Sequence, residues 1–225
     1  MGTRLLIFDM DGVLVDVTDS YRRTIAETVK LFTGTEITNG EIQELKNRGH
    51  SNNDWDLTLE IVESLGRRTT KEQVIAEFQK IYLGNNYDGL IARERWLPQN
   101  GLFERLAQRF RFAMFSGRER WEVLHTLGKF APGAVFDPIV GMEDVKREKP
   151  DPEGLLKIVE QLAPEEVFYI GDVMDDCLAA RAARVSFIGV VGDEIPMRAK
   201  LESLFREQGA RAVIASVNEL ESVLP

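Results

Sequence analysis

Two aspartates near the N-terminus, Asp9 and Asp11, directly follow the short apolar run at positions 5–8. An apolar run of this length is typical of a strand buried on both faces of a sheet. Open α/β sheets place their ligands at the carboxyl ends of such strands. Neighbouring carboxylates repel each other unless a cation or a proton lies between them. The pair therefore indicates a metal-assisted carboxylate site.

Three further polar clusters stand where an element is predicted to end or begin. Ser116 follows the apolar run 112–115, Lys149 precedes a predicted helix, and Asp172, Asp175 and Asp176 follow the run 167–170. Parallel strands present their carboxyl ends at one edge of a sheet, so these clusters can converge there. Carboxylates suit a hard cation such as Mg²⁺, while a hydroxyl and an ammonium group can bind a phosphoryl group. Together these groups predict attack on phosphorus.

The pattern around these clusters predicts an α/β fold with a doubly wound, mostly parallel Rossmann-like sheet. Helical spacing and capping signals predict four helices within residues 20–82, and no strand is indicated between about residues 16 and 95. We therefore expect an α/β catalytic core formed by residues 1–15 and 96–225, with residues 16–95 inserted as an α-helical cap domain. Asp16 and Arg95 lie in the two segments that cross between these parts, and such segments are expected hinges.

The composition narrows the class of partner and the setting. The chain has 225 residues and a formal net charge of −9, which argues against a nucleic-acid or anionic membrane surface. Cys177 is the only cysteine, so a disulfide framework is excluded and a cytoplasmic location is expected. No apolar run reaches transmembrane length, and no secretory signal pattern precedes Asp9. We expect a monomer or homodimer that acts on a small molecule.

Four motifs in order make the chain resemble the haloacid dehalogenase-like hydrolase superfamily, in its helical-cap, phosphoglycolate phosphatase-like branch. The motifs are Asp9-Met10-Asp11-Gly12-Val13-Leu14-Val15-Asp16, then Ser116, Lys149-Pro150-Asp151-Pro152, and Gly171-Asp172-Val173-Met174-Asp175-Asp176. Each motif is weak alone, but the four in this order cover nearly the whole chain. The resemblance implies a Mg²⁺-dependent phosphoric monoester hydrolase that acts on a small phosphorylated metabolite.

The resemblance also implies the catalytic roles. Asp9 would attack the phosphoryl group to form an aspartyl-phosphate, a covalent strategy open to carboxylates. Asp11 would protonate the leaving oxygen and later accept a proton from the hydrolytic water. Asp9, the backbone carbonyl of Asp11 and Asp172 would hold the Mg²⁺ ion.

The resemblance also implies which residues bind the phosphoryl group. Ser116, Gly117 and Lys149 would bind the transferring group, with Lys149 also counted as catalytic. Asp176 would hold Lys149 or a metal-bound water rather than the metal itself. The residue after the motif serine is commonly Asn, so Gly117 removes one side-chain donor and leaves the substrate less defined.

A polar loop between the second and third predicted helices is the candidate for substrate specificity. In similar proteins this loop closes over the active site, and Lys46, Arg48 and His50 are its leading candidates for substrate contact. Asn47, Asn52 and Asn53 add further donors. The alternative is an ordinary solvated surface loop.

Other functions on the same scaffold remain open. A phosphomutase is disfavoured because an acid usually precedes the fourth-motif aspartate, where this chain has Gly171. A phosphonate hydrolase would need a Schiff-base lysine, for which Lys46 is the candidate. A haloacid dehalogenase is disfavoured by Asp11. A catalytically silent ligand-binding module is the alternative outside enzymes. The segment 52–55 also resembles family members linked to histidine biosynthesis, which adds histidinol phosphate to a substrate screen.

Overall fold

The structure, a computed structural model, describes residues 3–49 and 52–225. Its main sheet has the strand order β5-β4-β1-β6-β7-β8, and every pair in it is parallel. The chain fills one side of β1 and then crosses to the other, which makes the sheet doubly wound and confirms the predicted fold class. The strands are β1 (Arg4–Phe8), β4 (Arg111–Phe115), β5 (Phe136–Val140), β6 (Glu166–Gly171), β7 (Ser186–Val190) and β8 (Ala212–Ile214).

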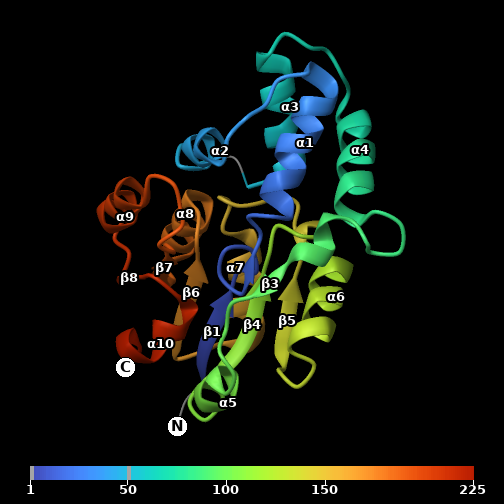
Figure 1. The fold of residues 1–225 in the computed structure, drawn as a ribbon. Coiled ribbons are helices and arrows are strands. Elements are labelled where there is room, and N and C mark those ends of the chain that lie inside the picture. Colours follow the sequence, from blue (N-terminus) through green and yellow to red (C-terminus); the bar gives the residue numbers. More distant parts are fainter. Residues whose placement is uncertain (1–2, 50–51) are drawn as a thin grey trace.

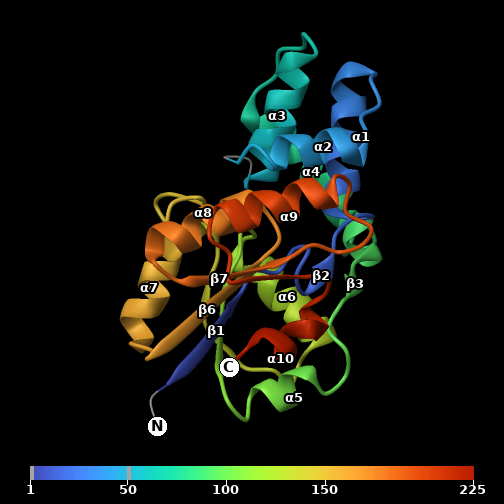
Figure 2. The ribbon, with the colours of Figure 1, turned by 90° about the vertical axis from the view of Figure 1, so that its left-hand side faces the viewer.

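Helices cover both faces of this sheet (Figures 1 and 2). The alternation of side chains along β1 divides the core: Leu6 and Phe8 belong to one apolar cluster, Leu5 and Ile7 to the other. The first cluster includes residues of α5 (Leu102–Leu106), α6 (Arg120–Phe130) and α10 (Leu220–Val223). The second includes residues of α7 (Glu153–Leu162), α8 (Met174–Ala183) and α9 (Arg198–Glu207). Double-sided burial explains why β1 is apolar from Leu5 to Phe8.

A helical insertion stands over the carboxyl-end edge of the sheet (Figures 1 and 2). It contains α1 (Tyr21–Thr33), α2 (Asn39–Lys46), α3 (Asp54–Ser64) and α4 (Lys71–Leu83). Capping boxes begin α2 at Thr38 and α4 at Thr70, each supplying two hydrogen bonds to the first helical turn. The chain enters through β2 (Val15–Asp16) and leaves through β3 (Arg95–Trp96), which pair antiparallel. The two crossing segments therefore lie side by side.

Two elements differ from the sequence prediction. Leu102, Leu106 and Phe110 stand at helical spacing and predict one helix, but α5 ends at Leu106, and Phe110 is buried just beyond it. Helix α9 was not predicted, because Leu201 and Phe205 are its only buried residues and the others are mostly charged. Its large apolar residues, Leu201, Leu204 and Phe205, span little more than one turn, which is too short a run to identify a helix. Short 3₁₀ turns complete the described elements at Leu90–Arg93, Met142–Asp144 and Val217–Glu219.

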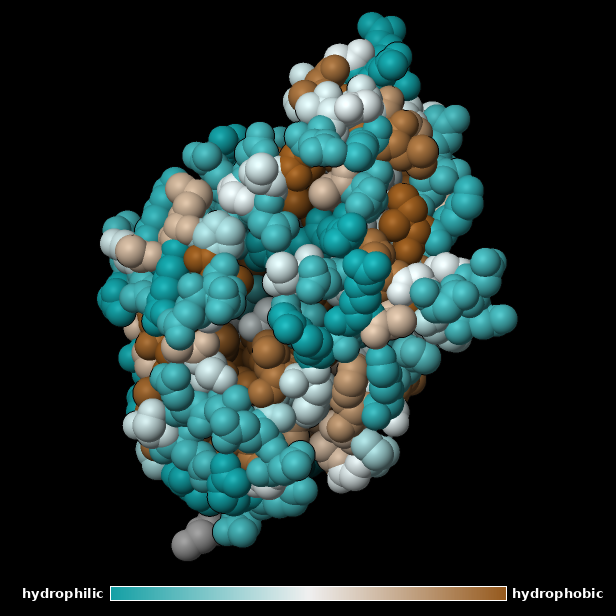
Figure 3. Space-filling view, in the orientation of Figure 1, coloured by the Kyte–Doolittle hydropathy of each residue, from teal (hydrophilic) through white to brown (hydrophobic). Residues whose placement is uncertain are grey.

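The outer surface is predominantly polar on the face drawn in Figure 3, where hydrophobic residues occur in scattered groups. Within residues 3–49 and 52–225, no helix combines the length and the apolar character that crossing a membrane would require.

Candidate active site

The sheet brings the sequence clusters together as expected. Asp9, Ser116 and Asp172 each directly follow a strand, at the ends of the neighbouring strands β1, β4 and β6. The backbone N–H of Asp9 donates to the carbonyl of Ile170 on β6, which fixes the first aspartate against the fourth motif at 2.8 Å. Lys149 reaches the same point from the loop before α7.

Lys149 is buried between two carboxylates. Its Nζ donates to Oδ1 of Asp9 at 3.1 Å and to Oδ1 of Asp176 at 2.7 Å. The second oxygen of Asp176 accepts the backbone N–H groups of Asp172 and Val173 at 3.1 and 3.2 Å. Burial opposes the ammonium charge, but the two carboxylates outweigh it and raise the pKa of Lys149. Asp176 therefore positions Lys149 and the fourth-motif loop.

Three carboxylates offer oxygens that lie within 4.8 Å of one another: Asp9, Asp172 and Asp176. Since both oxygens of Asp176 already accept hydrogen bonds, Asp9 and Asp172 are the better metal candidates. Burial raises the pKa of Asp9 and raises that of Asp172 to about 7, and the neighbouring carboxylates add to both shifts. A divalent cation between them would restore the ionised forms. The donor set, made only of oxygens, fits a hard cation such as Mg²⁺.

Gly12 allows the first-motif loop to lie against Asp172. Its φ of 70° is in the left-handed region, and a Cβ at this position would overlap the Asp172 carboxylate. Any larger residue would have to displace the Asp172 side chain. The glycine thus lets the first-motif loop approach Asp172, one of the two metal candidates.

Asp11 is held by an arginine that the sequence analysis did not identify. Arg118 donates through Nε and Nη2 to Oδ1 of Asp11 at 2.8 and 2.6 Å, and through Nη2 to Oε1 of Glu94 at 2.6 Å. The side chains of Arg118 and Glu94 are both 1% exposed. The sequence did contain a signal for Arg118, because this residue directly follows Ser116 and Gly117. Glu94 offered none, because only the fold brings it to this point.

Tyr169 is a second residue that the sequence analysis missed. Its buried hydroxyl donates to Oδ1 of Asp176 at 2.7 Å and lies 3.3 Å from Nζ of Lys149. Burial and the Asp176 charge raise the pKa of Tyr169, so the hydroxyl keeps its proton for this bond. Within the apolar pattern of β6 it resembled an ordinary core residue.

A small cavity of about 40 Å³ joins the sheet edge to the helical insertion. The sheet part and its loops contribute Asp9, Asp11, Gly117, Lys149, Asp172 and Val173, and the insertion contributes Val17, Arg22, Lys46, Asn52 and Asp54. Of the loop candidates, Lys46 lines the cavity and pairs with Asp54 at 2.6 Å. Arg48 is exposed and is not among the lining residues. His50 lies outside the described residues.

Asn52 takes the space beside Gly117. A Cβ at Gly117 would lie 2.9 Å from Nδ2 of Asn52. This Nδ2 is buried and has no hydrogen-bond partner within residues 3–49 and 52–225. The glycine therefore makes room for the Asn52 amide of the insertion. This amide occupies the space where a side chain at position 117 would lie.

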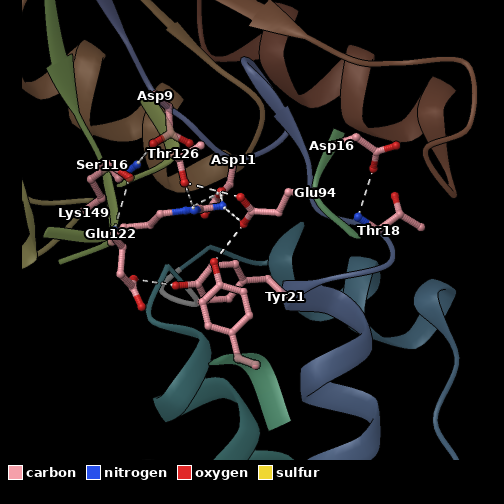
Figure 4. A network of polar contacts seen from close by, with 12 residues as sticks. Asp9, Asp11, Asp16, Thr18, Tyr21, Glu94, Ser116, Glu122, Thr126 and Lys149 are labelled. Atoms are coloured by element: carbon pink, nitrogen blue, oxygen red, sulfur yellow. Dashed lines mark hydrogen bonds and ion pairs between the residues drawn. The ribbon is translucent and has the colours of Figure 1, made fainter. Parts of the chain in front are cut away.

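Glu122 on α6 is a buried carboxyl at the edge of this site. It is 1% exposed and accepts the hydroxyl of Tyr21 at 2.7 Å (Figure 4). Burial raises its pKa to about 7, although the Arg118 charge opposes the shift. The folded protein therefore retains a proton here that the unfolded chain releases near pH 4.5.

Glu122→Gln is expected to flatten the pH dependence of stability. As the pH rises from about 4.5 to about 7, the raised pKa makes the wild type lose stability by up to about 1.4 kcal/mol per pH unit. Between pH 5 and pH 8 the wild type should lose about 2–3 kcal/mol more than the variant, as measured by urea unfolding. Equal losses in the two proteins would show that Glu122 is ionised throughout.

Comparison with known proteins places this chain in a family. The haloacid dehalogenase-like hydrolase family matches residues 6–190. Phosphoglycolate phosphatase 1 of Pseudomonas aeruginosa is 26% identical over 81% of the chain and 67% of the relative. An imidazoleglycerol-phosphate dehydratase of Phytophthora nicotianae is 31% identical over 98% of the chain, which spans only 52% of that relative's length.

A solved structure extends the agreement to the fold. A haloacid dehalogenase-like hydrolase from Bacteroides fragilis superposes with a TM-score of 0.77 at 27% identity, covering 97% of this chain and 99% of the other. The resemblance predicted from the four motifs is thus confirmed over most of the chain. The protein belongs to the haloacid dehalogenase-like hydrolase family.

Proposed function

We propose that the protein is a Mg²⁺-dependent phosphatase that hydrolyses a small phosphorylated metabolite through an aspartyl-phosphate on Asp9. The observation that carries this proposal is the position of Asp9 between Lys149 and Asp172, where a nucleophile, a cation and a metal candidate meet. The phosphoglycolate phosphatase among the relatives supports this class of substrate. The proposal includes a cytoplasmic setting and a monomer or homodimer.

In this mechanism the side chains have separate tasks. A carboxylate oxygen of Asp9 bonds to phosphorus as the bond to the leaving oxygen breaks, and Asp11 gives that oxygen a proton. Lys149, the Ser116 hydroxyl and the backbone N–H of Gly117 stabilise the charge on the phosphoryl oxygens. Water then attacks phosphorus and passes a proton to Asp11, which releases phosphate and regenerates Asp9. Mg²⁺, held by Asp9, the Asp11 carbonyl and Asp172, would neutralise phosphoryl charge when bound.

The helical insertion acts in this proposal as a cap. Residues 1–15 and 96–225 form the catalytic core, and residues 16–95 cover it. The cavity of about 40 Å³ is too small to exchange a metabolite freely, so substrate entry requires the cap to move. The paired segments β2 and β3, with Asp16 bound to Arg95, are the expected hinge.

A panel of phosphorylated metabolites, assayed with and without Mg²⁺, tests the function. We expect phosphate release that EDTA abolishes and Mg²⁺ restores. Mg²⁺ should also stabilise the fold by about 2.7 kcal/mol at a hundred times its Kd, because it binds only the folded carboxylates. No hydrolysis of any ester together with tight binding of one would favour a silent ligand-binding module. Conversion of a sugar phosphate without phosphate release would favour a phosphomutase.

A second candidate substrate is a phosphate ester that carries an imidazole ring. The dehydratase relative from Phytophthora nicotianae is named for such a compound and matches 98% of this chain. Histidinol phosphate and imidazoleglycerol phosphate therefore belong on the panel. A kcat/KM for either that exceeds the value for 2-phosphoglycolate would select this candidate.

A further inference from the structure

Arg22 carries an unpaired charge in the wall of the active-site cavity. It lies in the first turn of α1, is 5% exposed, and lines the cavity together with Asp9 and Lys149. Among the described residues its Nη1 has no hydrogen-bond partner, and no carboxylate forms an ion pair with it. Asp172 is close enough for the Arg22 charge to lower its pKa, but no hydrogen bond joins the two side chains. A buried guanidinium whose Nη1 has no acceptor is costly to the folded state, which points to a ligand that supplies one.

The other cations at this site are already neutralised. Each of them donates to at least one carboxylate: Lys149 to Asp9 and Asp176, Lys46 to Asp54, and Arg118 to Asp11 and Glu94. Arg22 is therefore the cation around the described cavity that is left for an additional anion.

Neutral amides hold the Arg22 guanidinium in place. Its Nη2 donates to Oε1 of Gln43 at 2.7 Å, and Nε2 of Gln43 donates to Oδ1 of Asn47 at 2.8 Å. Gln43 is buried on α2, and Asn47 is buried at the C-terminal end of that helix. This relay fixes the direction of the guanidinium without reducing its charge. Such pre-organisation favours a planar, bidentate acceptor.

We propose that Arg22 binds a carboxylate on the leaving group, so that the substrate is a small phosphorylated carboxylic acid. This inference rests on the proposed phosphatase function. The phosphoryl end of the ester belongs with Asp9, Ser116 and Lys149 on the sheet, so a group bound by Arg22 on the insertion is the other end of the ester. A cavity of about 40 Å³ leaves space for few atoms between the two ends. Arg22 also disfavours a cationic leaving group.

Three esters with two-carbon leaving groups test this assignment: 2-phosphoglycolate, ethyl phosphate and phosphoethanolamine, whose distal groups are anionic, neutral and cationic. We expect wild-type kcat/KM to fall in that order. Arg22→Gln should lower the ratio of kcat/KM for 2-phosphoglycolate to that for ethyl phosphate by about 10- to 100-fold, the effect of losing one charge-assisted hydrogen bond. Arg22→Lys should restore part of the ratio.

Gln43→Glu provides a test that keeps the arginine. The new carboxylate would neutralise Arg22, and Asn47 could donate to it through Nδ2, which has no partner among the described residues. The same ratio should fall. Arg23→Gln is the matched control, since Arg23 is exposed and pairs with Glu27, and it should leave the ratio unchanged.

The outcomes separate this inference from the proposed function. An unchanged ratio in Arg22→Gln and Gln43→Glu, or an equal fall for both esters as expected for a phosphoryl contact, would overturn it. Calorimetric binding of the same two esters to Asp9→Asn protein gives the ratio without turnover. If the wild type hydrolyses no ester, the proposed phosphatase is wrong, while the binding ratio still decides the role of Arg22.

Discussion

Replacing Asp9 with Asn is expected to reduce Mg²⁺-dependent phosphate release by at least about a thousandfold, because the amide cannot serve as the nucleophile. The fold should survive the change. The substitution removes one carboxylate from a buried group whose members raise each other's pKa, and Lys149 retains Asp176 as its partner. Activity is measured with 2-phosphoglycolate or an aryl phosphate, and stability by urea unfolding.

Asp19→Asn is the matched control for this experiment. Asp19 is exposed and lies outside the cavity, so its amide variant should keep wild-type turnover. Turnover by Asp9→Asn within about tenfold of the wild type would exclude a covalent role for Asp9. A lost fold in Asp9→Asn would instead contradict the view that Asp9 contributes chemistry rather than stability.

Replacing Arg118 with Met is expected to lower the free energy of unfolding more than any other single substitution proposed for this protein. Among the described residues, the variant would leave buried Glu94 with only the hydroxyl groups of Tyr82 and Thr126 as partners, at 2.8 and 3.4 Å. Breaking a buried ion pair in this way costs about 3–5 kcal/mol, because one charge stays desolvated and uncompensated. Urea unfolding at pH 7 measures the loss.

Two further variants test the explanation. Removing both charges in Arg118→Met/Glu94→Leu should recover much of the stability, since apolar groups of similar volume can replace a buried pair. Arg120→Met should change stability by no more than about 0.5 kcal/mol, because Arg120 is exposed and pairs with Asp144 at 3.3 Å. A double variant as unstable as Arg118→Met would show that packing, not charge, is lost.

Much of the fold could be predicted because the sheet is buried on both faces. Most strands contain a run of apolar residues, and Asp9, Ser116 and Asp172 come directly after β1, β4 and β6. Parallel strands share one carboxyl edge, so their positions in the sequence were enough to expect them together. The starts of α2 and α4, at Thr38 and Thr70, could be recognised in the sequence because a capping box is a local interaction.

The contacts that complete the site depend on tertiary structure. Arg118 meets Asp11 across 107 positions and Glu94 across 24, and neither separation follows a local periodicity. In the sequence, Arg22 is only one residue of a predicted helical segment. Its buried, unpaired guanidinium becomes visible only when α1 is placed over the cavity. The position of Asn52 beside Gly117 likewise becomes apparent only in the folded structure.

The central claim, a phosphoryl group carried by Asp9, is tested most directly by reductive trapping. The Mg²⁺-loaded enzyme is mixed with substrate, quenched with borohydride and digested, and the peptide that contains residue 9 is sequenced by mass spectrometry. An acyl phosphate is reduced to an alcohol, so we predict homoserine at position 9 in the wild type and none without substrate. Full turnover with an unmodified Asp9, or homoserine at another aspartate, would contradict the mechanism.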